Sequence, residues 1–305
     1  MTVDNTCGFV VPLKFCYLYY KRNGGQDEAS KTPPALKPNV SDNFKTTLSP
    51  KKMENFKKYI FEYLLILITI ILTVLGFWNI FLGADAKPNP YQTFHLIVNF
   101  SWLFLMLYQL SLIGNKQGIK HKRVGLSILF FGPLFFAQAV LLAIHSAQKG
   151  LVSGEGDFLI VQNGLGAIEL GLIILLAFIL KKRRKIHAAF LISTVVLMLH
   201  ISIFFLLLAV APGLIGYGMY ITLFVGFLFF LKDRRNGWPI LVCSSTFIIN
   251  NFIHLILNEH GLIKPLTEFV GSLNELIMFF VSFIVLLFLL ISTGITNKGR
   301  VATLK

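Results

Sequence analysis

The apolar and polar positions of this chain alternate in long blocks rather than residue by residue. Eight stretches contain no Lys or Arg over at least about 18 residues, and a helix needs about 20 apolar residues to cross roughly 30 Å of hydrocarbon. Their approximate limits are 59–83, 92–114, 124–147, 157–180, 186–210, 213–231, 238–257 and 268–292. The pattern predicts an all-α, polytopic membrane bundle of about eight transmembrane helices.

The boundary between the fifth and sixth stretches depends on a short sequence, Ala211-Pro212-Gly213. Proline cannot continue the hydrogen-bond ladder of a helix, and glycine tolerates positive φ. A turn at Pro212 and Gly213 therefore divides what would otherwise be one very long apolar segment.

Composition agrees with a membrane location. Hydrophobic residues make up 55% of the 305 residues and charged residues 14%, with a mean hydropathy of +0.72, which excludes the ordinary soluble class. The net charge of +14 comes from short basic clusters between apolar stretches and forms no basic and aromatic surface, so we expect the lipid bilayer as partner and no nucleic acid. The three cysteines have neither zinc-site spacing nor an even count.

The basic clusters also predict orientation, because loops that stay in the cytoplasm are enriched in Lys and Arg. The other side holds Lys87, Lys149 and Lys264, which share their loops with acidic residues. We expect both termini on the cytoplasmic side of a cytoplasmic (inner) membrane. The cytoplasmic set comprises Lys51, Lys52, Lys57, Lys58, Lys116, Lys120, Lys122, Arg123, Lys181 to Lys185, Lys232, Arg234, Arg235, Lys298, Arg300 and Lys305.

Three regions follow along the chain. Residues 1–52 are polar and rich in Pro and Lys, so we expect a disordered segment. Residues 53–297 form the transmembrane domain, and residues 298–305 form a cytoplasmic tail. The sequence from Met53 reads as the natural start of a membrane protein, which makes an over-extended start an expectation of the sequence.

Polar side chains inside the apolar stretches are the candidates for function, since each costs several kcal/mol unless it faces another helix or water. In the second stretch His95, Asn99 and Trp102 fall at i, i+4 and i+7, with Gln109 seven further on. In the other stretches the expected polar centre consists of Glu169, near the middle of the fourth, His200 in the fifth and Asn250 in the seventh. The alternative is structural, because amide and small side chains often serve helix packing.

The leading specific hypothesis is binding of b-type haem or a metal for electron transfer. Two axial histidines must come from different helices at one depth. His95, His145 and His254 form the outer set of candidates, and His121 and His187 the inner pair. The layout resembles the di-haem cytochromes b of membranes in architecture, but the fourth stretch here has no histidine.

Two other hypotheses stay open. In the first, the chain is a proton-coupled transporter of a small solute, with Glu169 as the protonatable centre and His200 and the seventh helix lining a path. In the second, it is a non-catalytic scaffold or assembly factor. The sequence has no nucleotide-binding, hydrolase or metalloprotease signature, so an enzyme is disfavoured. A homo-oligomer or a membrane-complex partner is left open.

One stretch carries a closer likeness. The sequence FHLIVNFSWLFLMLYQLSLIGNKQGIKHKRVG, from Phe94 to Gly125, is followed by a second basic loop and a His-initiated helix, RRKIHAAFLIST. This pattern resembles a group of bacterial multi-pass proteins that has no assigned activity, over about residues 60–235. The resemblance implies a membrane bundle and importance for the matching positions, which are His95, Trp102, Gln109, His121, Gly125 and His187.

Overall fold

The computed structural model describes residues 57–84, 86–153 and 159–302. The predicted disordered segment 1–52 lies outside these ranges, and so do Glu155 and Asp157. Every described element is a helix, which confirms the all-α prediction. In chain order they are α3 (Ile60–Gly76), α4 (Trp78–Phe81), α5 (Pro90–Gly114), α6 (Gly118–Gly125), α7 (Ile128–Ser153), α8 (Ile160–Ile179), α9 (Arg184–Val210), the 3₁₀ turn η1 (Pro212–Leu214), α10 (Tyr217–Lys232), α11 (Trp238–Glu259), α12 (Ile263–Gly271) and α13 (Glu275–Ala302).

Six of the described helices are long and apolar enough to cross a membrane. They are α5, α7, α8, α9, α11 and the Glu275–Thr293 part of α13. The apolar helices α3 and α10 are shorter, with 17 and 16 residues, or roughly 26 and 24 Å at 1.5 Å per residue. The structure therefore has the helices of a multi-pass membrane protein.

Three helix boundaries differ from the sequence prediction. The first predicted helix, 59–83, ends at Gly76 and is followed by the short α4. The third predicted helix, 124–147, corresponds to α7, which starts only at Ile128, after the separate helix α6 that contains His121. The eighth stretch, 268–292, is divided between α12 and α13, and α13 continues to Ala302, into the predicted tail.

Local sequence explains the best-defined helix starts and one break. Asn89 caps α5: its side chain accepts from the backbone N–H of Gln92, the Gln92 side chain accepts from the Asn89 N–H, and Pro90 occupies the first turn. The predicted break after α9 is confirmed, because α9 ends at Val210 and Pro212 starts η1. Capping and proline thus fix where these helices begin and end.

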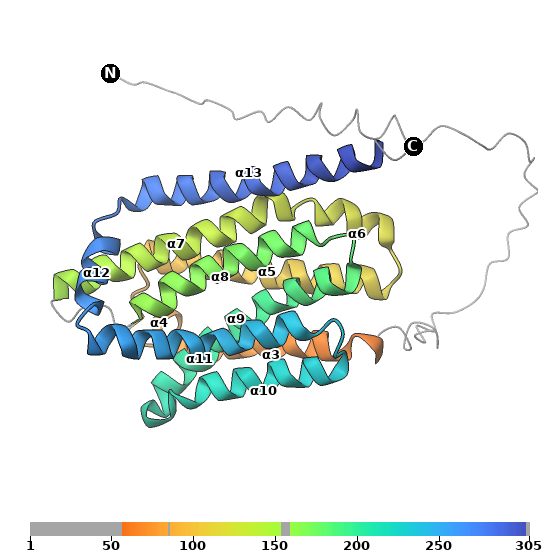
Figure 1. The fold of residues 1–305 in the computed structure, drawn as a ribbon. Coiled ribbons are helices and arrows are strands. Elements are labelled where there is room, and N and C mark those ends of the chain that lie inside the picture. Colours follow the sequence, from red (N-terminus) through yellow and green to blue (C-terminus); the bar gives the residue numbers. More distant parts are fainter. Residues whose placement is uncertain (1–56, 85, 154–158, 303–305) are drawn as a thin grey trace, which may run out of the picture. The chain divides into compact units, whose positions relative to one another are not determined.

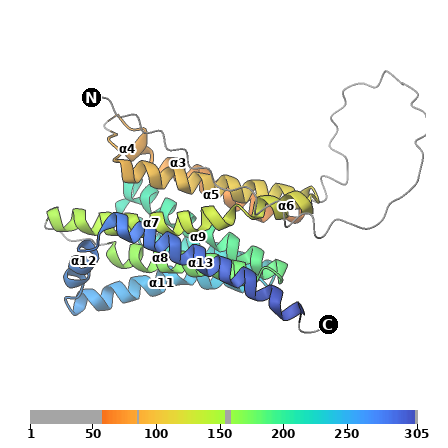
Figure 2. The same ribbon diagram turned by 90° about the horizontal axis from the view of Figure 1, so that it is seen from above.

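Helix α9 lies at the centre of the bundle and contacts α3, α8, α10 and α11. Twelve of its residues are buried, more than in any other described helix. Figures 1 and 2 show the long helices side by side, with α13 lying along α7 and α10 along α11. Close packing at one crossing needs glycine, since a Cβ on Gly76 would lie 2.6 Å from the Ser202 carbonyl oxygen.

Candidate functional site

A cavity of about 530 Å³ lies among the long helices. Its walls come from α3, α4, α5, α7, α8, α9, α10 and α11, and four histidines line it, His95, His145, His200 and His254. We call it the histidine cavity. The three outer histidines of the sequence prediction therefore do line one cavity, together with His200.

The cavity occupies one half of the bundle. On α5 it reaches from the Asn89 cap to Asn99, and on α8 from Leu159 to Leu170. These residues belong to the first half of each helix, whereas α7 lines the cavity from Phe135 to Lys149, towards its C-terminal end. The cavity therefore lies at the end of the bundle where α5 and α8 begin, and it stops near their mid-length. Most of its wall is apolar. The polar lining residues besides the histidines include Gln92, Gln138, Ser146, Gln162, Asn163, Ser202 and Asn251.

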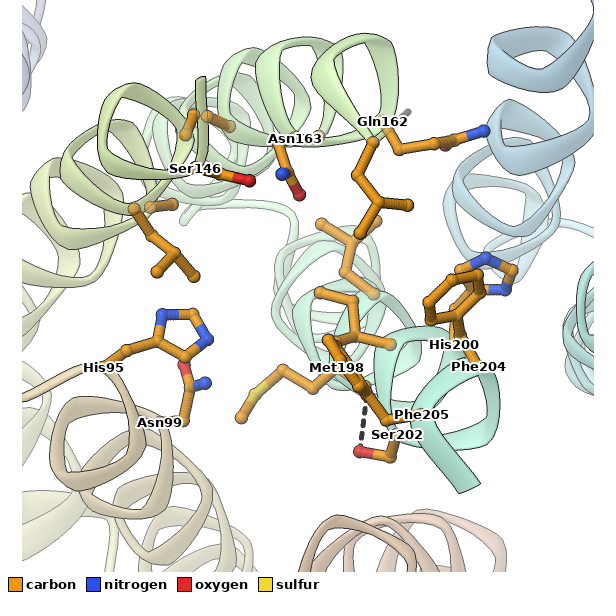
Figure 3. Close-up of a pocket in the computed structure, with 18 of the residues that line it drawn as sticks. His95, Asn99, Ser146, Gln162, Asn163, Met198, His200, Ser202, Phe204 and Phe205 are labelled. Carbon is orange, nitrogen blue, oxygen red and sulfur yellow. Dashed lines mark hydrogen bonds between the residues drawn. The ribbon is translucent and has the colours of Figure 1, made fainter. Parts of the chain in front are cut away.

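Figure 3 shows how the polar side chains face the space. His95 and Asn99 lie on the α5 wall, and His200 lies on the α9 wall opposite them. Asn163 projects from α8 above them. Polar groups therefore converge on the cavity from three helices that are far apart in sequence.

The α5 wall is held by a hydrogen bond to α7. His95 Nδ1 bonds to the Gln138 Oε1 atom, which leaves the other ring nitrogen of His95 outside that bond. Both residues line the cavity. The amide nitrogen Nε2 of Gln138 and the Oδ1 oxygen of Asn99 are buried and have no hydrogen-bond partner.

Helices α9 and α11 contribute two further imidazoles to the cavity lining, those of His200 and His254. The Nδ1 atom of His200 lies 3.2 Å from the Thr222 hydroxyl, and its ring stacks on Phe247 with 3.6 Å between centroids. His254 belongs to α11, and its buried Nδ1 atom has no partner. Both residues therefore line an otherwise apolar space.

Both ring nitrogens of His145 are engaged by other side chains. Its Nε2 atom lies 3.1 Å from the Asn89 side-chain nitrogen, and its Nδ1 atom lies 3.0 Å from Glu275 Oε1. Tyr91 stacks on the ring with 4.2 Å between centroids. Both nitrogens have partners, so His145 joins α5, α7 and α13 rather than offering a free ligand atom.

Glu169, the predicted polar centre, lies outside the cavity lining. Its carboxylate accepts hydrogen bonds of 3.0 Å from the Thr246 hydroxyl and 3.0 Å from the Asn250 amide, both on α11. The structure thus brings together Glu169 and Asn250, two members of the predicted polar centre, whereas a third member, His200, lines the cavity instead. Sequence reasoning could place the carboxylate at mid-depth and could not name its partners.

The inner residues Gln109, His121 and His187 are linked through α6: His121 and His187 interact electrostatically, and the Gln109 amide lies beside Gly125 of the same helix as His121. We call these three residues the glutamine–histidine cluster. His187 Nδ1 donates to the Ala177 carbonyl at 2.6 Å. Burial, and secondarily the nearby His187, hold the pKa of His121 below its usual range. The Gln109 amide approaches Gly125, which shares a face of α6 with His121 because the two are four residues apart.

Gln138, which pairs with His95, was not among the site residues predicted from the sequence. Its only signal was a single amide in the apolar stretch 124–147. Phe247 and Met198 gave no signal at all, because an aromatic or thioether side chain in a membrane helix is ordinary. Within the described residues, no group of three or more His, Cys, Asp or Glu is placed to hold a metal ion.

No known protein family, curated protein or solved structure matches the chain. The function must therefore be argued from the site itself.

Proposed function

We propose that the chain is a carrier of eight transmembrane helices, with both termini in the cytoplasm and located in the cytoplasmic membrane, which binds a small uncharged solute in the histidine cavity. The six long apolar helices support the membrane location. The shorter α3 and α10 pack along α9 and α11, and the basic clusters favour an even number of spans.

Three unpaired polar atoms carry the proposal: Asn99 Oδ1, Gln138 Nε2 and His254 Nδ1. All three residues line the cavity, and a buried polar atom without a partner costs about 1–3 kcal/mol. The oxygen accepts a hydrogen bond, the amide nitrogen donates one, and the imidazole nitrogen does either. A solute with both a donor and an acceptor would satisfy all three.

The lining also favours a solute without positive charge. None of the described residues that line the cavity is Asp or Glu, and Lys149 is its one fully charged side chain. A cation would enter a largely apolar space without a counter-charge, which is costly. The volume of about 530 Å³ is that of a typical small-molecule site, about 300–1,000 Å³.

The end of the cavity near the middle of the bundle favours a carrier over a simple receptor. Phe135 and Leu170 line this end, and the fully buried Trp102 packs on Phe135 with 5.0 Å between ring centroids. A cavity that lies in one half of the bundle and stops at such a layer fits one state of an alternating-access cycle, in which the layer opens to the other side.

The earlier alternatives have less support. A haem held by two histidines needs two free imidazole nitrogens that face each other across the iron. Both nitrogens of His145 are taken, so only His95 and His254 remain of the three outer candidates. Proton coupling centred on Glu169 would need that carboxylate on the solute path, whereas its oxygens bond to α11 outside the cavity lining. A non-catalytic scaffold does not explain the cavity, because three unpaired buried polar atoms lower stability unless a ligand satisfies them.

Two glycines of α8 provide the test. A Cβ added at Gly166 or at Gly164 meets nothing within 4 Å, but only Gly166 is among the lining residues. Gly166→Phe should therefore fill the cavity, and Gly164→Phe serves as the matched control. The purified full chain would be heated in detergent with nucleosides and aromatic amides as probes, and with choline as a cationic comparison.

We expect an uncharged probe to raise the melting temperature of the wild type and of Gly164→Phe, but not of Gly166→Phe. Uptake of that probe into proteoliposomes should show the same dependence. A shift that survives in Gly166→Phe would overturn the proposal. A reduced haem absorbance band that disappears in His95→Ala would establish the electron-transfer alternative instead.

The eight-span topology has a separate test. In a background without Cys7, Cys16 and Cys243, single cysteines would replace Gly213 and Arg235, which flank α10. An impermeant maleimide added to intact cells should label the first and spare the second. Equal labelling would show that α10 does not cross the membrane.

A further inference from the structure

The glutamine–histidine cluster has hydrogen-bonding atoms that the protein itself leaves unused. Gln109 is 8% exposed, and neither its amide oxygen nor its amide nitrogen has a partner. The Nδ1 atom of His121 is also buried without a partner. Buried polar atoms in native proteins are nearly always paired, so three such atoms in one cluster indicate an occupant.

The cluster also reaches the surface. His121 and His187 are half-buried, while their neighbours Lys122 and Arg123 are exposed. The bond from His187 Nδ1 to the Ala177 carbonyl fixes the orientation of that ring and leaves its Nε2 atom for another partner. The two half-buried rings can therefore be approached from the membrane surface, and an occupant would reach the buried Gln109 amide by displacing the side chains that cover it.

Charge decides what kind of occupant fits. The flanking segments 116–123 and 181–185 contain nine Lys and Arg residues and no Asp or Glu. The nearest acid contact that the structure gives them is Asp233, 3.4 Å from Lys185. A divalent metal ion would find only two imidazoles in a strongly positive field, whereas an anion is attracted by that field.

We propose that Gln109, His121 and His187 form a binding site for a phosphate group, supplied either by an anionic lipid headgroup or by a soluble phosphate compound. The Gln109 amide and the His121 ring would donate hydrogen bonds to phosphate oxygens, and the basic segments would balance the charge. His187 already donates its Nδ1–H to Ala177, so its Nε2 atom would donate to the phosphate only in the protonated ring, which a bound anion favours. A hydroxyl of the same ligand would donate to the Gln109 amide oxygen. The Gln109 amide nitrogen lies 4.0 Å from the position that a Cβ on Gly125 would take, which places the amide beside α6.

The site lies apart from the histidine cavity and does not rest on the proposed carrier function. On α5, Asn99 and Gln109 are ten positions apart, or about 15 Å along the helix. Between them Trp102, Leu103 and Met106 are buried in the hydrophobic core. Loss of phosphate binding and loss of solute binding can therefore be observed separately.

The test uses the purified full chain in an uncharged detergent. Thermal unfolding and native mass spectrometry would be recorded with phosphatidylglycerol, with phosphatidylcholine, with inorganic phosphate, and with chloride at equal ionic strength. Gln109→Glu keeps the side-chain size but places a carboxylate against the phosphate, and Gln109→Met removes the polar atoms. Lys87→Gln, at the other end of the bundle, is the control for a lost basic residue.

We expect phosphatidylglycerol to raise the melting temperature of the wild type by roughly 5 °C at saturation, with one lipid retained. Gln109→Glu and Gln109→Met should weaken that binding by at least about 10-fold, and Lys87→Gln should not. The same shift with inorganic phosphate would identify a soluble phosphate as the source. Equal shifts with chloride, or shifts that persist in both Gln109 variants, would mean general attraction to the basic surface and would overturn the proposal.

Discussion

The amide of Asn250 donates a 3.0 Å hydrogen bond to Glu169 Oε1 and joins α11 to α8. Asn250 is 2% exposed, and the Thr246 hydroxyl donates to the other carboxylate oxygen. A carboxyl group inside an apolar bundle is costly unless its oxygens are satisfied. These two hydrogen bonds therefore give Glu169 a structural role, which is to hold α8 against α11 outside the cavity lining.

Removal of the carboxylate should destabilise the protein without preventing solute binding. Glu169→Leu leaves the buried Asn250 amide without its acceptor, at a cost of about 1–3 kcal/mol, and Glu169→Gln should cost less because one oxygen remains. Thermal unfolding in detergent measures the loss, with the exposed Glu259→Gln as control. Abolished probe binding in a folded Glu169→Gln protein would return this residue to the functional centre.

Glycine at the crossing of α3 and α9 should be intolerant of a methyl group. A Cβ at Gly76 would lie 2.6 Å from the Ser202 carbonyl oxygen and 3.2 Å from the Leu206 nitrogen. Both are backbone atoms and cannot move alone, so Gly76→Ala should cost about 1–3 kcal/mol by overpacking. Gly164→Ala, which meets nothing within 4 Å, should leave the melting temperature almost unchanged.

The same crossing shows what the sequence could and could not predict. The apolar stretch 59–83 has no internal break signal, yet α3 ends at Gly76, where it meets α9. The break at Pro212 was predictable because proline acts on its own backbone. Local chemistry is readable from one segment, whereas a close approach between two helices depends on residues more than a hundred positions apart.

The candidate site also has features that the sequence predicted and features that it could not. The periodic spacing of His95 and Asn99 predicted that one face of α5 points into the bundle, and both residues line the cavity. The bond from His95 to Gln138 could not be predicted, because nothing in either helix sets the register between α5 and α7. Likewise, Glu169 was identifiable from its depth, but Thr246 and Asn250 became its partners only through the packing of α8 against α11.

The buried indole of Trp102 should depend on one hydroxyl. Its Nε1–H donates to Thr194 Oγ1 at 2.8 Å, and both residues are 0% exposed. Thr194→Val keeps the shape but leaves the indole N–H unpaired, which should cost about 1–3 kcal/mol. Thermal unfolding measures this, with the exposed Thr93→Val as control. An equal loss in the two variants would show that the Trp102 bond contributes nothing particular.

His121 should make the protein less stable in acid. Burial and the neighbouring His187 lower its pKa in the folded chain below the ordinary value of 6.5, so the unfolded chain takes up its proton first as the pH falls. The stability contributed by the neutral ring is present above about pH 6.5 and is lost as the pH falls toward the lowered folded pKa.

Melting temperatures recorded between pH 8 and about pH 5 without phosphate should therefore decline less steeply for His121→Phe than for the wild type. Other histidines titrate in both proteins, so the difference between the two curves isolates His121. Parallel curves would show that His121 gains a proton as readily in the folded chain as in the unfolded one.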